Sequence, residues 1–159
     1  MPYFYHICRM NNTHLRKGTP SDIPDLLELI KELAAYEKEP EAVIVTEEIL
    51  LEDGFGENSI FDFLVAEKVG KIAGIALYYT KYSTWKGRCL YLEDIIVKES
   101  ERMNGIGSIL LKELISISEK AGVKRLEWQV LDWNEPAINF YKKHKAIIDE
   151  EWLNCKVEF

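Results

Sequence analysis

Apolar residues recur along this chain with two periods, a helical one and a strict alternation, which together predict helices and strands in mixed order. The first predicted helix begins at Ser21 or Asp22, both good capping residues, and frays near residues 37–40. A second short helix is predicted to begin at Thr46 and to stop at Gly54. The stripe that the first helix should bury consists of Ile23, Leu26, Leu27, Ile30, Leu33 and Ala34.

Alternating apolar and polar residues predict strands on both sides of these helices. In the strand that ends at Val97, the alternation breaks over residues 95–97, and a break in phase of this kind predicts a bulge. Residues 81–88 are predicted to form a polar loop before that strand. These elements predict a mixed α/β domain whose sheet is partly antiparallel. The predicted strands are residues 14–17, 61–67, 72–79, 90–97, 125–130, 146–148 and 152–159.

The segment RMNGIGS, residues 102–108, joins the strand at 90–97 to a helix predicted from Ile106 to Ala121. Its two glycines let the backbone approach a ligand, the helix start adds a partial positive charge, and Arg102 adds a full one. On spacing alone, a phosphate site and an ordinary tight turn are equally compatible with this pattern. A P-loop is excluded because no Gly-Lys-Ser/Thr follows, and a dinucleotide fold would require a third glycine.

Composition narrows the class of protein. A chain of 159 residues predicts one domain over 1–159, with residues 1–9 either an N-terminal extension or an extra edge strand. The net charge of −7 argues against nucleic acid and suits a cationic substrate. Cys8, Cys89 and Cys155 have no pattern, so we expect free thiols of a reducing compartment, with neither a disulfide frame nor a metal site. Because the apolar runs are too short for a membrane span and no signal peptide is evident, we expect no membrane partner and a cytoplasmic location.

Several motifs resemble a known family. The loop at 102–108 resembles the acyl-CoA pyrophosphate loop, R-x-x-G-x-G, of the GNAT superfamily of N-acetyltransferases. Further stretches resemble the spermidine/spermine (diamine) N-acetyltransferase family, and together the match covers about Leu15 to Trp152. Residues 82–87, YSTWKG, resemble the thialysine N-acetyltransferase branch, whereas polyamine-acetylating members resemble Y-D-P-W there. The other stretches are LEDGFG at 51–56, YLED at 91–94, DWNEP at 132–136 and INFYK at 138–142.

This resemblance implies the GNAT acyltransferase fold, a central mixed and mostly antiparallel sheet that splays between strands 4 and 5 and is flanked by helices. It also implies direct acetyl transfer from acetyl-CoA to a small amine, without a metal, in a homodimer. Glu93 is the implied base for the amine, and Tyr141 the implied general acid. The implied acetyl-CoA residues are Ile95, Ile96, Val97, Arg102, Met103, Asn104, Gly105, Ile106, Gly107, Ser108, Asn134, Glu135, Pro136, Ala137, Asn139 and Tyr141. The implied amine-site residues, partly across the dimer, are Tyr36, Glu37, Trp85, Glu93, Asp94, Glu127, Trp128, Gln129, Glu150 and Trp152.

The chain departs from the family pattern at two glycine positions. Met103 replaces the first glycine of R-G-x-G-x-G, for which we expect altered loop packing and retained binding. Lys145 stands where a glycine commonly ends the helix after the N-F-Y motif. Two other functions stay open: a peptide or protein N-acetyltransferase, and a non-catalytic acyl-CoA-binding module. A lysine-like ω-amine is as well supported as spermidine.

Overall fold

The computed structural model describes residues 12–159, so the predictions for residues 1–9 and Cys8 lie outside the described residues. The chain divides into two compact units, one that extends to Trp128 and one that runs from Gln129 to Phe159. The single domain over 1–159 stays a prediction. Within residues 12–159, no helix has the length and the apolar character that crossing a bilayer requires.

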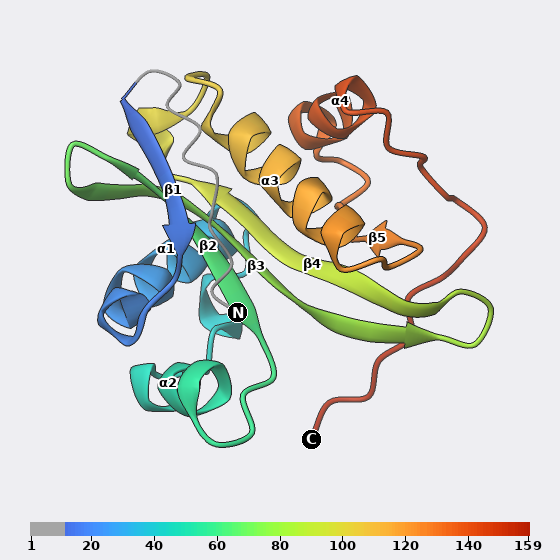
Figure 1. Ribbon diagram of the computed structural model, residues 1–159, viewed down its shortest axis with the longest axis horizontal. Coiled ribbons are helices and arrows are strands. Elements are labelled where there is room, and N and C mark those ends of the chain that lie inside the picture. Colours follow the sequence, from blue (N-terminus) through green and yellow to red (C-terminus); the bar gives the residue numbers. More distant parts are fainter. Residues whose placement is uncertain (1–11) are drawn as a thin grey trace. The chain divides into compact units, whose positions relative to one another are not determined.

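The first unit is built on a five-stranded sheet with the order β1-β2-β3-β4-β5 (Figure 1). The pairs from β1 to β4 are antiparallel, and β5 pairs with β4 in parallel. This arrangement confirms the predicted mixed and mostly antiparallel sheet. The strands are β1 (Thr13–Lys17), β2 (Asp62–Lys68), β3 (Lys71–Ser83), β4 (Gly87–Val97) and β5 (Leu126–Glu127).

In this unit, α1 and α2 lie on one face of the sheet and α3 lies on the other (Figure 1). Thr46 caps α2 as predicted, because its Oγ1 accepts a hydrogen bond from the Ile49 amide at 3.3 Å. The predicted stop at Gly54 is wrong, since α2 continues to Phe55. A Cβ at Gly54 would lie 2.9 Å from the Phe61 ring, so this glycine serves a close packing contact. The helices are α1 (Ile23–Tyr36), α2 (Glu47–Phe55), α3 (Ile106–Lys120) and, in the second unit, α4 (Glu135–Lys143).

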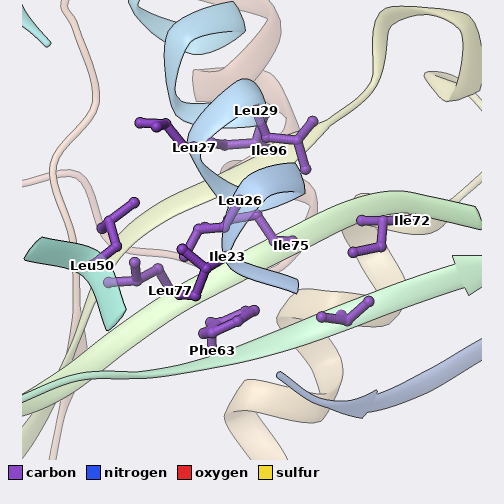
Figure 2. Packing of buried hydrophobic residues seen from close by; sticks show 11 residues of the cluster. Ile23, Leu26, Leu27, Leu29, Leu50, Phe63, Ile72, Ile75, Leu77 and Ile96 are labelled. Carbon is purple, nitrogen blue, oxygen red and sulfur yellow. The ribbon is translucent and has the colours of Figure 1, made fainter. Parts of the chain in front are cut away.

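The core between α1, α2 and the sheet consists of aliphatic side chains around Phe63 (Figure 2). Each fully buried leucine or isoleucine here contributes about 1.5–3 kcal/mol relative to an exposed one. Of the predicted stripe of α1, the first three residues are buried, while Ile30, Leu33 and Ala34 are half-buried. Leu29, which lies outside the predicted stripe, is fully buried. On the opposite face, α3 approaches so closely that a Cβ at Gly74 would lie 3.3 Å from Ile106 Cγ2. The α1-side cluster comprises Ile23, Leu26, Leu27, Leu29, Leu50, Phe63, Val65, Ile72, Ile75, Leu77 and Ile96.

The polar loop predicted at 81–88 is wrong. Instead, β3 continues to Ser83 and β4 begins at Gly87, which leaves a turn at residues 84–86. Ser83 Oγ accepts hydrogen bonds from the amides of Trp85 and Lys86, both at 3.2 Å. The end of this hairpin exposes Lys81, Tyr82 and Arg88, so its polar composition reflects exposure to water and not the absence of strands.

The two strands predicted at residues 146–148 and 152–159 are absent. Residues 144–159 form neither helix nor strand, and β5 spans only Leu126–Glu127 of the predicted 125–130. The β4–β5 register consists of Leu90 with Leu126 and Tyr91 with Glu127. Among the described residues, the β4 stretch 92–97 therefore has no β5 partner, and the pairing ends where the resemblance places the splay. This stretch includes Ile95, Ile96 and Val97, which are predicted to hold acetyl-CoA.

Candidate active site

A bulge in β4 turns two consecutive acids toward the side of the sheet that α1 covers. Leu77 of β3 pairs with Asp94, while the next residue of β3 pairs with Leu92. Glu93 is therefore the extra residue of the bulge. In a regular strand Asp94 would share a face with Leu92, two residues before it, whereas the bulge turns Asp94 to the face of Leu77. The predicted bulge is confirmed, and its predicted position at 95–97 is wrong by two residues.

Asp94 lies close to two other carboxylates. Burial raises the pKa of its carboxyl group to about 7, with further contributions from the negative charges of Glu93 and Glu37. Glu37 caps the C-terminus of α1, and burial raises the pKa of its carboxyl group as well. A carboxyl group that titrates near neutral pH is well matched to accept a proton during a reaction. The structure thus brings together three predicted amine-site residues from α1 and β4.

Glu93 accepts a hydrogen bond from the Tyr79 hydroxyl at 3.0 Å. Burial raises the pKa of the Tyr79 phenol, and its hydrogen bond to Glu93 raises it further. The phenol therefore stays protonated near neutral pH and remains a donor to Glu93. Sequence reasoning missed Tyr79 because its relation to Glu93 depends on where the bulge lies. Once the bulge is placed at Glu93, the pairing of β3 with β4 identifies Tyr79 as a neighbour of Glu93 on the same face of the sheet.

The loop at 102–108 has the geometry of an anion site. Gly105 caps α3 at a φ of 79°, and helix geometry leaves the amides of the first turn without intrahelical partners. Met103 has a φ of 63°, a left-handed conformation at the position where the resembled family has glycine. Arg102 Nε donates a hydrogen bond to the Val97 carbonyl at 3.2 Å. Oriented amides and a guanidinium are donors that suit a pyrophosphate, so this loop fits the group predicted for it.

Two contacts join this loop to neighbouring elements. The Arg102 guanidinium lies 5.2 Å from the centre of the Tyr36 ring at the end of α1, which places a predicted amine-site residue beside the predicted acetyl-CoA loop. Asn104 Nδ2 donates to Glu101 Oε2 at 3.5 Å, and Lys68 Nζ donates to the same oxygen at 2.6 Å. An open pocket beside these residues is lined by Glu32, Ala35, Tyr36, Lys98, Glu99, Ser100 and Arg102.

Two other predicted amine-site residues of the first unit, Trp85 and Glu127, do not join the acids at the bulge. Trp85 is exposed at the tip of the β3–β4 hairpin, and the strand from Gly87 to Glu93, which rises by roughly 20 Å, separates it from the bulge. One chain therefore does not bring Trp85 to Glu93. Glu127 forms ion pairs with Lys81 and with Arg125, so its carboxylate already has two cationic partners. Trp128, which follows β5, is half-buried.

In the second unit, α4 carries the predicted general acid. Asn134 caps this helix, because its Oδ1 accepts a hydrogen bond from the Ala137 amide at 3.3 Å, and Pro136 lies in the first turn. Tyr141 is buried, and its ring packs edge-on against Phe140 with centroids 5.2 Å apart. The other residues of this helix that are predicted to hold acetyl-CoA, Glu135 and Asn139, are exposed.

The residue after the C-cap of α4, Lys145, has a left-handed backbone conformation although the resembled family commonly has glycine there. Lys145 has a φ of 62°, and its amide donates to the Lys142 carbonyl at 3.0 Å. The Ala146 amide donates to the Tyr141 carbonyl at 3.1 Å, which completes a Schellman motif. Beyond it, the predicted amine-site residues Glu150 and Trp152 are exposed, and Gln129 Nε2 donates to Asn154 Oδ1.

Known proteins resemble this chain over nearly its whole length. A family model described as the acetyltransferase (GNAT) family matches residues 23–145. The thialysine N-epsilon-acetyltransferase of Mus musculus is 39% identical over 160 residues, which cover 94% of this chain and 94% of that protein. The protein of the same name from Bos taurus is 43% identical over 151 residues, 89% of each chain.

The fold is also shared with solved structures. An aminoglycoside acetyltransferase from an uncultured soil metagenomic sample, solved in complex with sisomicin, superposes with a TM-score of 0.77. The superposition covers 94% of this chain and 97% of that chain, at 19% identity. At this identity the likeness concerns the fold alone.

Proposed function

Since this chain belongs to the GNAT family of acetyltransferases, we propose that it transfers an acetyl group from acetyl-CoA directly to a primary amine of a small molecule within a ternary complex. The proposed amine is a diamine, a polyamine or a thialysine/lysine-like molecule. The relatives named for thialysine support this class, and the net charge of −7 suits a cationic substrate. The observation that carries the proposal is the pair of acids at the β4 bulge.

The first requirement of the reaction is removal of a proton from the amine, and the acids at the bulge are suited to accept this proton. An alkylammonium group has a pKa near 10.4 and does not react as a nucleophile while it is protonated. Asp94, with a pKa of about 7, is ionised in about half of the molecules at neutral pH and accepts a proton more readily than an ordinary carboxylate. Glu93 lies beside it and is oriented by Tyr79. We therefore assign the proton transfer to the pair, with Glu93 as the predicted base.

The loop at 102–108 would hold the pyrophosphate of acetyl-CoA, whose thioester supplies the activated acetyl group. Arg102 offers a positive charge, and the left-handed Gly105 aims the start of α3 outward. Tyr141 is the proposed donor of a proton to the departing thiolate. The residues of α4 and the β4 end, Ile95 to Val97, are proposed to complete the site.

A single assay separates the proposed function from its rivals. The purified chain would be given acetyl-CoA with spermidine, a diamine, thialysine or a short peptide, and free thiol would be measured. We expect turnover of small amines and not of the peptide. Turnover of the peptide alone would support a peptide N-acetyltransferase, and acetyl-CoA binding without turnover of any amine would support a binding module.

Variants assign the roles in the same assay. Glu93→Gln should lower turnover roughly ten- to a thousandfold, the usual range for one proton-transfer group. Tyr141→Phe should lower turnover while acetyl-CoA affinity stays nearly unchanged. Glu57→Gln, which removes an exposed acid after α2, is the matched control and should act like the parent chain. Near-normal activity of Glu93→Gln and Tyr141→Phe would contradict these assignments.

Direct transfer excludes an acetylated enzyme. Cys89 is buried and Cys155 is exposed, and both are free thiols. After mixing with acetyl-CoA in the absence of amine, intact mass spectrometry should show no acetylated cysteine. Cys155→Ala should retain turnover close to that of the parent chain. An acetylated cysteine that is chased to product by added amine would contradict direct transfer.

A further inference from the structure

The sheet face that carries Asp94 continues toward the β3–β4 hairpin as an aromatic floor. Tyr79 pairs with Tyr91 in the register of β3 and β4, and Tyr91 pairs with Glu127 of β5, so all three side chains share this face. The two rings lie 5.3 Å apart with an angle of 32° between their planes. Tyr79 joins this floor to the acids of the bulge through its hydrogen bond to Glu93.

A cationic cluster lies at the far end of this floor. Lys81 Nζ lies 5.2 Å from the centre of the Tyr91 ring and forms an ion pair with Glu127. Arg125 Nε lies 2.5 Å from the second oxygen of the same carboxylate. Two cations thus share one carboxylate, which leaves one net positive charge in the cluster of Lys81, Arg125 and Glu127. Burial and the surrounding acids raise the pKa of the Tyr91 phenol, so this ring adds no charge near neutral pH.

The two ends of the floor therefore carry opposite charge. The near end holds the acids Glu37, Glu93 and Asp94, and the far end holds the net positive cluster. Asp94 lies opposite Leu77 of β3, and Lys81 stands four residues beyond Leu77, about 13 Å along the strand. Lys81 Nζ reaches back over the ring of Tyr91, which lies opposite Tyr79, two residues or about 7 Å from Leu77. The separation that remains is comparable with the length of an extended lysine molecule.

We propose that Lys81, supported by Arg125, is a specificity-determining residue that binds the carboxylate of an amino acid whose ω-amine lies at Glu93 and Asp94. This inference rests on the proposed amine acetylation. An ammonium group has three N–H donors, and Glu127 accounts for one side of Lys81, whose side chain is 47% exposed. The same charge repels the second ammonium of a diamine or polyamine. Glu127, predicted as an amine ligand, acts here as the counter-charge that holds Lys81 over Tyr91.

The test compares three substrates that differ only at the far end: a lysine-type ω-amino acid, its amide, and the diamine that lacks the carboxyl group. In the parent chain, kcat/KM should be about tenfold higher for the acid than for the amide or the diamine. Lys81→Met should lower kcat/KM for the acid about tenfold and raise kcat/KM for the amide and the diamine severalfold, since both carry an ammonium group and no carboxylate at the far end. Lys81→Arg should keep the preference for the acid, since it keeps the charge.

Lys71→Met is the matched control, because it removes an exposed lysine from the other end of β3, and it should keep the parent's preference. Equal kcat/KM for acid, amide and diamine in the parent chain would overturn the inference and leave the proposed function standing. An equal loss of kcat/KM for all three substrates in Lys81→Met would also overturn the inference alone. Turnover of no amine at all would overturn the proposed function, and this inference with it. Since the first comparison needs only the parent chain, it holds even if Lys81→Met does not fold.

Discussion

Partial burial of the Asp94 carboxyl group, together with the nearby carboxylates of Glu93 and Glu37, raises its pKa to about 7 from a usual value of 3.8. Below pH 4 the group is protonated in both the folded and the unfolded chain, so it has no effect on stability there. Between pH 4 and 7 the unfolded chain loses the proton while the folded chain keeps it. Ionisation therefore favours unfolding increasingly up to pH 7, and the effect is constant above.

Asp94→Asn should stabilise the fold and lower turnover without abolishing it. At pH 8 the free energy of unfolding should rise by roughly 1–4 kcal/mol, because the variant removes a carboxylate that the folded chain disfavours. Urea denaturation at pH 8 and at pH 4 would measure this, and the gain should vanish at pH 4. Glu57→Gln, at an exposed position, should leave stability unchanged at both. A variant that is less stable than the parent chain at pH 8 would contradict the electrostatic account of Asp94.

Met103 holds a left-handed backbone conformation, with a φ of 63°, and its side chain is fully exposed. This conformation costs an ordinary residue about 1–2 kcal/mol, which glycine avoids at a smaller entropic cost in the unfolded chain. Met103→Gly should raise the free energy of unfolding by about 0.5–1 kcal/mol, measured by urea denaturation. Met103→Ala keeps the Cβ and should give no such gain. Loss of stability in Met103→Gly would mean that the methionine side chain holds the loop in place.

At the scale of elements, the sequence pattern predicts one of the two β-hairpins better than the other. The turn after β2 is predictable, since Gly70 interrupts two alternating runs. The extent of the β3–β4 hairpin is not, because a strand exposed on both faces has the composition of a loop. The pattern places the bulge too late in β4, because Glu93 looks like an ordinary solvent-facing residue of an alternating strand. Its role depends on its partners in β3, which sequence spacing does not reveal.

The turn between β2 and β3 carries a removable strain. Val69 and Gly70 both have positive φ, 51° and 70°, as a two-residue type I′ turn requires. A β-branched residue is poorly suited to this conformation, whereas asparagine adopts it readily. Val69→Asn should raise the melting temperature by about 2–4 °C, which corresponds to about 1 kcal/mol in a domain of this size. A melting temperature that is unchanged or lower would show that the exposed valine makes contacts that offset the strain.

At the scale of the whole molecule, the sequence predicts the order of elements as far as α4 and the cap of α2, and the family resemblance predicts that Glu37 lies near the acids of β4. It does not predict the contacts of Lys81. Lys81 lies beside Glu127 only because the registers of β3 with β4 and of β4 with β5 put both residues on one face of the sheet, and the sequence does not reveal these registers. The strands predicted at 146–148 and 152–159 fail for another reason. Alternation of apolar and polar residues predicts that a segment is able to pair as a strand. The segment becomes a strand only where the edge of a sheet is available to pair with it.

A homodimer would supply such an edge and stays a prediction. Apolar side chains of the last segment are exposed in the single chain, and a monomer that leaves them in water loses their burial energy. Light scattering at micromolar concentration should give twice the chain mass of 18.5 kDa. A monomer mass at that concentration would count against the dimer and against any contribution of Trp85 from a second copy. The exposed side chains are Ile147, Ile148, Trp152, Leu153, Val157 and Phe159.

The central claim is that the acids at the β4 bulge accept the proton of the amine, and the pH dependence of kcat/KM tests it most directly. If Asp94 must be ionised and the amine must arrive protonated, kcat/KM for a lysine-type amine should rise to a plateau above pH 7 and fall near pH 10. In Asp94→Asn the limb near pH 7 should disappear. A single rise that continues to the pKa of the free amine, with no break near pH 7 and the same shape in Asp94→Asn, would contradict the account.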